Sequence, residues 1–308
     1  MARATAARGG ARRFAAAALL ALSLIGGTLD ACAQEPVAIA AAAKSFKLGA
    51  LDISVLRDGA LNIPNDGSIF GLNAKPADVA AVLRAAGAPT DKIRLDIDAL
   101  LIRMPKHVVL VDTGYGPGHG HLLASLAAAG ATPADVTDIF ITHAHPDHVG
   151  GLVDAQGKPA FPAATIRLSA KEWAHMQSEA GTGKEAAAIA AQVVTFEPGK
   201  PVLPGITPIA LYGHTPGHVG YRIESQGHAL IDIGDIAHSS IVSLARPGWT
   251  ILWDGDKAEG VKTRTRELGR LATSHELMFA PHFPFPGVGH IEKAGHGFRF
   301  EPGLPTGK

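Results

Sequence analysis

The chain has 308 residues, 46% of them hydrophobic, and its 28 basic and 28 acidic residues give a formal net charge of zero. This balance provides no long-range attraction to nucleic acid or to an acidic lipid surface, so we expect neither as a partner. A small neutral molecule is the expected binding partner. The length suits one large α/β domain or two small ones.

The first 33 residues have the three parts of an export signal. Arg3, Arg8, Arg12 and Arg13 precede an apolar run over residues 14–25, and Ala31-Cys32-Ala33 provides a small-residue cleavage site. We therefore predict a signal peptide over residues 1–33 and an exported protein, periplasmic or secreted. The apolar run is shorter than the ~20 residues that span a bilayer, so we expect no stable membrane span.

Cys32 is the only cysteine of the chain. Cleavage after Ala33 would leave a mature chain without a thiol, and hence without a disulfide or a thiolate ligand. Two variants of export stay open beside ordinary secretion. Residues 29–32 resemble a bacterial lipobox, which would lipidate Cys32, although Asp30 is unusual there, and residues 12–14 resemble a twin-arginine signal.

Residues 34–47 are rich in alanine and predict a loose leader, and residues 48–308 predict one domain of alternating strands and helices. Asp256 is the expected N-cap of its longest helix. In chain order we expect a strand at 51–56, a helix at 76–87, strands at 93–104 and 107–111, a helix at 121–129, strands at 136–142 and 165–168, helices at 171–176 and 183–193, strands at 206–211, 220–223 and 229–233, a helix at 257–272 and a strand at 276–280.

The strand at 136–142 ends in the run Thr142-His143-Ala144-His145-Pro146-Asp147-His148. His143 and His145 alternate by two, so both imidazoles can project to one side of an extended segment. Asp147 and His148 follow in the turn and can face a second position nearby. A lone histidine is usually a surface or core residue, but four ligand-type side chains within six residues predict a site for two metal ions.

This run resembles the HxHxDH signature of the metallo-β-lactamase superfamily. Three later segments resemble the ligand motifs of that family in the same order, namely residues 213–218, 233–235 and 280–282. The resemblance implies an α/β (α+β) fold, the αββα sandwich, in which two mixed β-sheets carry helices on their outer faces. It also implies the metal ligands, with His143, His145 and His214 on one ion, Asp147, His148 and His282 on the other, and Asp235 bridging both.

Residues 51–59, 284–291 and 297–300 are similar to the exported methyl parathion hydrolases, which overlap the acyl-homoserine-lactone lactonases in fold and site. A ligand set of nitrogen and oxygen without sulfur suits two divalent ions, with Zn²⁺ favoured. Two such ions would favour a bridging hydroxide that attacks a carbonyl or phosphoryl centre. The resemblance thus implies hydrolysis of a small lactone, ester or phosphotriester, with Asp147 also a proton carrier.

Several residues near these motifs have two interpretations. His238 follows Asp235 by three residues, where some of the lactonases carry a tyrosine that touches substrate, so it could donate a hydrogen bond to substrate or lie on the surface. Asp112 and His218 could orient the ligands or simply pack. Tyr115, Trp173 and Phe285 could line an apolar substrate wall or belong to ordinary packing.

Other activities remain open on the same ligands. A glyoxalase II-like thioesterase is the closest alternative, and a β-lactamase using only histidine and aspartate stays open, whereas the charge balance disfavours a nuclease. A non-catalytic metal-binding protein is the alternative from a different class. The oligomeric state is also open, and a homodimer is one expectation.

Overall fold

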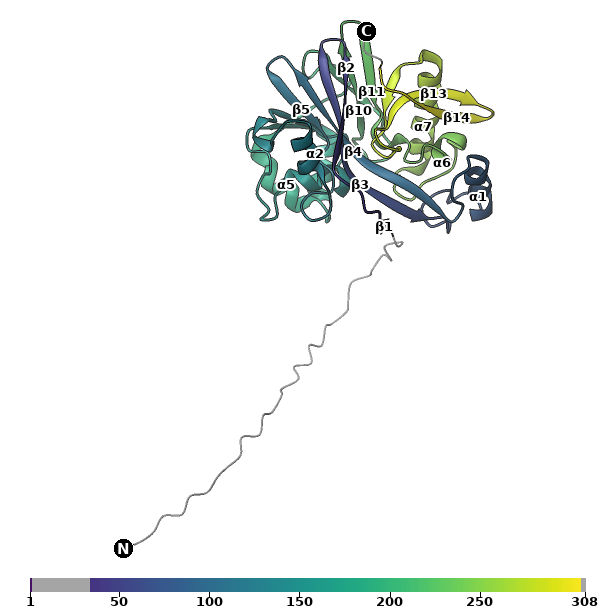
Figure 1. Cartoon of the computed structure of the whole chain (residues 1–308), viewed down its shortest axis with the longest axis horizontal. Coiled ribbons are helices and arrows are strands. Elements are labelled where there is room, and N and C mark those ends of the chain that lie inside the picture. The colour runs from purple at the N-terminus through teal and green to yellow at the C-terminus, as the bar shows by residue number, and fades with distance from the viewer. Residues whose placement is uncertain (2–33, 306–308) are drawn as a thin grey trace. The chain divides into compact units, whose positions relative to one another are not determined.

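Two mixed β-sheets, with helices outside them, form the part of the chain that the computed structural model describes, Met1 and residues 34–305. The signal peptide predicted over residues 1–33 lies outside that part apart from Met1. Figure 1 shows the strands in the middle, α2 and α5 on one side and α6 and α7 on the other. The predicted αββα arrangement is confirmed.

The first sheet runs in the order β1-β3-β4-β5-β6-β7-β8, with β2 also paired to β3. Its members from β5 to β8 are parallel, which brings their carboxyl ends to one edge. The strands are β1 (Glu35–Pro36), β2 (Ala42–Leu48), β3 (Leu51–Pro64), β4 (Lys92–Met104), β5 (His107–Val111), β6 (Asp138–Phe140), β7 (Thr165–Ser169) and β8 (Val193–Phe196).

The second sheet runs in the order β14-β13-β12-β11-β10-β9, and only β11 and β12 are parallel neighbours in it. Its strands are β9 (Ile206–Ala210), β10 (Val219–Ser225), β11 (His228–Asp232), β12 (Leu277–Phe279), β13 (Val288–Ala294) and β14 (Gly297–Pro302). The helices of the described chain are α1 (Pro76–Ala85), α2 (Leu122–Ala128), α3 (Pro146–Val149), α4 (Ala170–Ser178), α5 (Gly183–Ile189), α6 (Val242–Ala245) and α7 (Lys257–Ser274).

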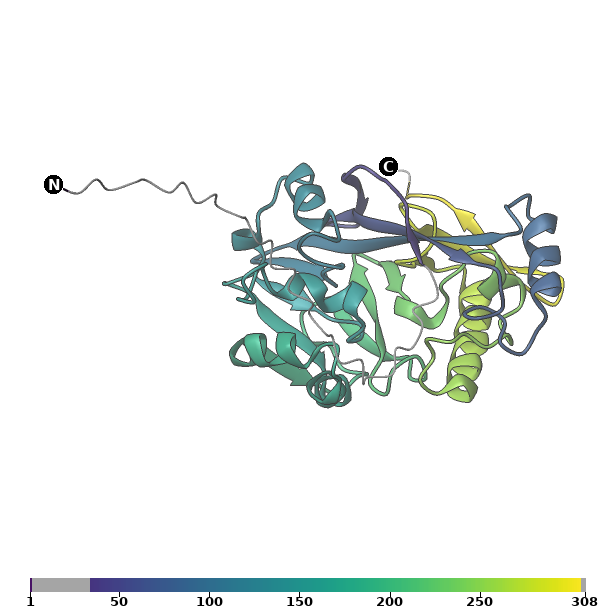
Figure 2. The ribbon, with the colours of Figure 1, turned by 90° about the horizontal axis from the view of Figure 1, so that it is seen from below.

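Apolar side chains fill the space between the sheets. Ile53 and Ile102 of the first sheet share one buried cluster with Val219 and Tyr221 of the second. The Tyr221 hydroxyl donates a hydrogen bond of 2.7 Å to the carbonyl of Ile141, which ties the sheets together beside the histidine run. Figure 2 shows the long β3 and β4 strands extending across the molecule toward α1.

The loose leader predicted over residues 34–47 is wrong for its second half. Ala42–Leu48 is strand β2, paired antiparallel with Leu51–Arg57, and Phe46 and Leu48 are buried. The alternation of polar and apolar residues over 45–48 explains the strand, because it places one apolar face on the core. The alanine-rich residues before residue 45 show no such alternation, so the sequence did not predict that the strand begins among them.

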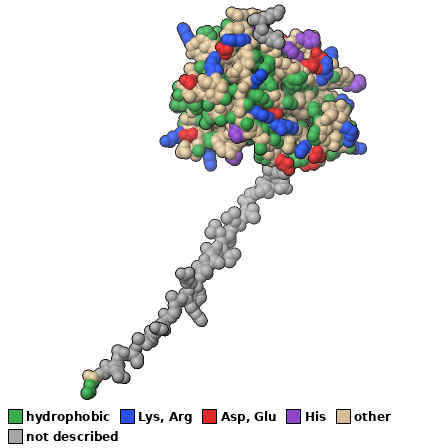
Figure 3. Space-filling model, in the orientation of Figure 1, with side chains coloured by type: hydrophobic (Ala, Val, Ile, Leu, Met, Phe, Trp, Pro, Cys, Tyr) green, Lys and Arg blue, Asp and Glu red, His purple; other side chains and the backbone are tan. Residues whose placement is uncertain are grey.

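Helix α7 begins as predicted. The Asp256 side chain accepts hydrogen bonds from the backbone N–H groups of Ala258 and Glu259, which satisfies two donors at the helix start. No helix within residues 34–305 is both long and apolar enough to cross a membrane. Charged side chains of both signs are scattered over the face shown in Figure 3.

An ion-pair cluster after α7 is expected to make the stability depend on pH. Arg222 and Arg270 both pair with Glu276 and, against the effect of burial, lower the pKa of Glu276 to about 2 from an ordinary value of 4.5. A carboxyl group with a lowered pKa stabilises the fold above its unfolded pKa, and this contribution disappears as the pH falls through the folded pKa. Glu276→Gln is therefore expected to lower the free energy of unfolding by about 1–2 kcal/mol at pH 7, since water screens the half-exposed Arg270.

Urea unfolding of wild type and Glu276→Gln at several pH values measures this effect. The difference between the two proteins should shrink between about pH 5 and pH 2, the window set by the two pKa values. A difference that stays constant over that range would show that Glu276 acts by packing and not by charge.

Candidate metal centre

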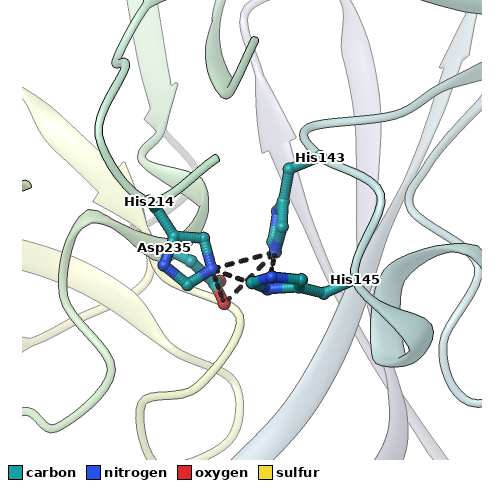
Figure 4. A group of neighbouring side chains, drawn as sticks. All are labelled: His143, His145, His214 and Asp235. Atoms are coloured by element: carbon teal, nitrogen blue, oxygen red, sulfur yellow. Dashed lines mark hydrogen bonds and ion pairs between the residues drawn. The ribbon is translucent and has the colours of Figure 1, made fainter. Parts of the chain in front are cut away.

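Three imidazoles and one carboxylate converge on a point at the edge of the sheets (Figure 4). His143 follows the end of β6, His145 precedes α3, and His214 lies in the loop between β9 and β10. The distances are 3.1 Å between His143 Nε2 and His145 Nδ1, 2.9 Å between His145 Nδ1 and His214 Nε2, and 3.2 Å between the Nε2 atoms of His143 and His214. Asp235 Oδ2 lies 3.6 Å from His143 Nε2 and 3.4 Å from His214 Nε2.

These distances fit a tetrahedral cation site. Nitrogen ligands at 2.0–2.1 Å from a tetrahedral Zn²⁺ are about 3.3 Å apart. Burial lowers the pKa of His143 and His214 well below the ordinary value and that of His145 to about 4. At neutral pH all three rings are therefore uncharged, and the converging nitrogens present lone pairs that a cation can satisfy together.

A second group consists of Asp147, His148 and His282. Asp147 Oδ2 lies 3.7 Å from His148 Nε2 and 3.5 Å from His282 Nε2. The same Oδ2 atom of Asp235 that faces the first group lies 3.4 Å from His148 Nε2 and 3.0 Å from His282 Nε2. Asp235 therefore stands between the two groups.

The second group attracts positive charge. Burial alone would lower the pKa of His148, but Asp235, Asp147 and Asp112 together raise it well above its ordinary value. His148 Nε2 is buried without a hydrogen-bond partner in the described chain. A divalent cation at this position would meet both the negative potential and the unpaired nitrogen.

Hydrogen bonds behind the rings fix their orientation. His148 Nδ1 donates to Asp112 Oδ2 at 2.7 Å, His214 Nδ1 to Asp254 Oδ1 at 3.1 Å, and His282 Nδ1 to the carbonyl of Asp96 at 2.9 Å. With Nδ1 engaged in these hydrogen bonds, Nε2 is the ring nitrogen that faces the centre, and a cation bound there would take the place of an Nε2 proton. Asp112 also accepts from the Thr142 backbone N–H at 2.8 Å, which supports its predicted orienting role.

His218 orients the central carboxylate and not an imidazole. It is fully buried, its Nδ1 donates to the carbonyl of Leu211 at 2.8 Å, and its Nε2 accepts the backbone N–H of Asp235 at 3.0 Å. This contact lies at the turn that follows β11, where Gly234 has a positive φ of 48°. These contacts favour the interpretation that His218 orients a residue of the site over the interpretation that it simply packs.

Glu172 links both histidine loops, a role that no motif in the sequence indicated. Its carboxylate, on α4, accepts hydrogen bonds from the Ala144 N–H at 2.7 Å, the Thr215 hydroxyl at 2.7 Å and the Gly217 N–H at 2.9 Å. The side chain is fully buried. Ala144 separates His143 from His145 and Thr215 follows His214, so one carboxylate positions all three imidazoles of the first group.

The alternative of a surface position for His238 is wrong. Its side chain is buried, its ring stacks on that of His282 with centroids 5.3 Å apart, and its Nε2 lies 3.2 Å from Asp235 Oδ2. Asp235, His238 and His282 form a third group whose ligand atoms lie close enough to hold a cation. His238 therefore belongs to the centre, beside the second group.

A pocket of about 270 Å³ opens on these side chains. Of the three aromatic residues with two interpretations, Tyr115 lines the pocket, whereas Trp173 and Phe285 pack against buried core clusters elsewhere. The apolar residues of the pocket wall that no motif indicated are Leu61, Leu95 and Trp253, and Gln34 lies at its edge.

The fold and the site define the class of protein, an αββα sandwich with His and Asp clusters that could bind metal at one edge of its sheets. The profile of the Metallo-beta-lactamase superfamily matches residues 94–274, more than half of the chain. The chain therefore belongs to the metallo-beta-lactamase superfamily.

Two solved structures are similar over nearly their whole length. AidC, described as a dizinc quorum-quenching lactonase in complex with a product N-hexanoyl-L-homoserine, is 28% identical with a TM-score of 0.82, and the match covers 87% of this chain and 99% of AidC. The hydrolase AbOPH of the beta lactamase superfamily is 29% identical with a TM-score of 0.80, covering 88% of this chain and all of AbOPH.

Two curated relatives match over shorter spans. Metallo-beta-lactamase domain-containing protein 1 of Xenopus laevis is 35% identical over 134 residues, 43% of this chain and 48% of that protein. Hydroxyacylglutathione hydrolase of Yersinia pestis (strain Pestoides F) is 33% identical over 123 residues, 40% of this chain and 41% of that protein. The matches thus span less than half the length of either relative.

Proposed function

We propose that the protein is a dinuclear metal-dependent hydrolase that cleaves a small lactone, ester or phosphotriester. The observation that carries the proposal is the position of Asp235 Oδ2, within 3.0–3.6 Å of ring nitrogens in both groups. Two divalent ions, when bound, would supply an activated water and a Lewis acid for the substrate carbonyl or phosphoryl oxygen. The sulfur-free ligand set favours Zn²⁺, and the likeness to a dizinc lactonase supports that choice.

The ligands follow from the two groups. We assign His143, His145 and His214 to one ion and His148, His282 and Asp147 to the other, with Asp235 shared. The hydrogen bonds to Asp112, Asp254 and the Asp96 carbonyl hold the rings in position before an ion arrives, which lowers the cost of ordering them.

Two side chains that line the pocket are assigned to the substrate. Asp147 lines the pocket and keeps 19% of its side chain accessible, so it can pass a proton to a departing oxygen there. His238 Nδ1 is buried and has no hydrogen-bond partner in the described chain. We assign His238 to donating a hydrogen bond to the substrate, and we propose export on the signal of residues 1–33.

A thioesterase of the glyoxalase II type is the second candidate. Its support is the likeness to a hydroxyacylglutathione hydrolase over 123 residues. The same residues would hold the ions and orient a thioester carbonyl, so the two candidate functions require the same metal ligands.

A substrate panel tests the proposal. Protein reconstituted with Zn²⁺ is expected to bind two ions per chain and to cleave an acyl-homoserine lactone, an aryl ester or an aryl phosphotriester at least ~10-fold faster than a lactoylglutathione-like thioester or a cephalosporin. A chelator should abolish the activity, and added Zn²⁺ should restore it.

Two results of this panel would contradict the proposal. A preference for the thioester would favour the second candidate. A protein loaded with two ions that cleaves none of the substrates would indicate a non-catalytic metal-binding protein.

A further inference from the structure

Gln34 lines the metal pocket beside the ligand residues. The pocket measures about 270 Å³, and its lining includes His145 of the first group and Asp147 and His282 of the second. This volume is at the small end of ligand sites, which typically measure ~300–1,000 Å³. In so small a space, the charge and shape of residue 34 affect whatever binds beside the metal ligands.

Strand β1 fixes Gln34 at this place through the backbone. Residues 35–36 pair with residues 61–62 of β3, and the Val37 N–H donates to the carbonyl of Ala60 at 2.8 Å. All of these contacts lie on the C-terminal side of Gln34. They therefore hold Gln34 at the pocket whether or not the peptide bond before it is intact.

The proposed cleavage after Ala33 makes Gln34 the N-terminal residue of the mature chain. A glutamine with a free α-amine can close a ring without a cofactor. The amine nitrogen attacks the side-chain carbon Cδ and forms a new C–N bond, the bond from Cδ to the amide nitrogen breaks, and ammonia leaves with the proton that the amine gives up. The product is a five-membered lactam, the pyroglutamyl residue, and its formation is favoured because both reacting groups belong to one residue.

The charge of the pocket favours the lactam over a free N-terminus. A free α-amine has an ordinary pKa of about 8, so at neutral pH it is mostly an ammonium. Two divalent ions, when bound, would leave excess positive charge against the carboxylates of Asp147 and Asp235 and would repel that ammonium. The lactam is uncharged, and it offers an N–H donor and a ring carbonyl at the edge of the pocket.

We propose that Gln34 is a modification site, and that after signal cleavage it cyclises to a pyroglutamyl residue that forms part of the pocket wall. The inference rests on the proposed function, both its export and its metal centre. It has a consequence for turnover. An uncharged N-terminus does not retain the carboxylate or phosphodiester anion that hydrolysis releases beside the metal ligands.

Mass spectrometry of the mature protein tests the modification directly. The full chain is expressed with its own signal in a bacterial host and purified after export. The mature mass should be lower by one ammonia than that of unmodified residues 34–308. N-terminal sequencing should be blocked until a pyroglutamyl aminopeptidase has acted on the unfolded chain. This readout requires neither a bound metal nor activity.

Gln34→Asn tests the position of the lactam in the pocket. The variant keeps an amide but cannot cyclise, because its shorter side chain would close only a four-membered ring, so its N-terminus stays an ammonium at neutral pH. Acetate serves as the probe for a carboxylate product. Calorimetry on the Zn²⁺-loaded proteins should show that the variant binds acetate about threefold more tightly than wild type at pH 7. The difference should disappear above about pH 9, where the ammonium has lost its proton.

Two further variants control this comparison. Glu35→Asp also shortens a side chain by one methylene, but Glu35 is exposed and does not line the pocket. It should be cyclised at Gln34 and bind acetate as wild type does. Gln34→Ala cannot cyclise either, and it replaces Gln34→Asn if the asparagine variant is cleaved at a different bond.

The outcomes separate this inference from the proposed hydrolysis. A free Gln34 amine, or a mature N-terminus at any other residue, a lipidated Cys32 included, would overturn the inference while the substrate panel still stands. A cyclised wild type that binds acetate no differently from Gln34→Asn would place the N-terminus outside the pocket and overturn it as well. A protein that is cyclised but binds no metal would instead contradict the proposed metal centre.

Discussion

Replacing Asp235 by asparagine is expected to lower the metal content from two ions per chain to one or none and to reduce hydrolysis at least ~10³-fold. The amide keeps the shape of the side chain but not its charge. The Asp235 carboxylate is buried, faces ring nitrogens of both groups through Oδ2, and has a second oxygen, Oδ1, without a partner in the described chain. The pKa of Asp235 lies well below its ordinary value, because the surrounding histidines outweigh the effect of burial. Elemental analysis and the kinetics of the best panel substrate measure both effects.

His238→Ala is the matched control for that experiment, because His238 also contacts Asp235 Oδ2, at 3.2 Å. We expect this variant to keep two ions and to lose only about 10- to 100-fold in turnover, through the lost hydrogen bond to substrate. Loss of an ion in His238→Ala would instead assign His238 to a metal site, as the third group of side chains permits. Unchanged kinetics would remove it from the mechanism.

Local patterns in the sequence predicted the strands and helices and the metal-binding run His143–His148, whereas the αββα fold and the ligands His214, Asp235 and His282 followed from the resemblance to the metallo-β-lactamase family. Period-two alternation and Gly/Pro-rich turns mark the strands, and the spacing of His143, His145, Asp147 and His148 is set by a few residues after β6. His214, Asp235 and His282 each lie in a short motif. The structure brings these segments together, although they are far apart along the chain.

The roles of residues whose contacts lie far away in the sequence could not be predicted. Glu172 has no motif, and its hydrogen-bond partners lie 28, 43 and 45 residues away along the chain. His238 is buried because Phe70 and Trp253 pack around it, and neither contact has a signal in the sequence. The helix predicted over 183–193 ends at Ile189 and is followed by a 3-10 turn over Ala190–Gln192, and the β-branched Val193 already belongs to strand β8 of the first sheet.

Glu172 holds the two loops that carry the histidines of the first group without contacting the imidazoles themselves, so its replacement is expected to weaken metal binding. In Glu172→Gln one side-chain oxygen becomes an NH₂ group that faces donors on the Ala144 loop or on the Thr215–Gly217 loop. At least one buried N–H or O–H then loses its acceptor, which costs about 1–3 kcal/mol in the free energy of unfolding. We expect the affinity for Zn²⁺ to fall about 10- to 100-fold, the range typical when a side chain that orients ligands is replaced.

Competition with a chelator measures this affinity, and thermal unfolding of the metal-free protein measures stability separately. Glu179→Gln is the control, since Glu179 follows the same helix but is exposed, and it forms an ion pair with His175 at 3.6 Å. If Glu172→Gln lowers stability but binds Zn²⁺ as tightly as wild type, then Glu172 serves the fold alone. A loss of affinity at the expected level would show that one buried carboxylate on α4 orders the first metal site. It would do so by fixing the positions of two loops that are distant in the sequence.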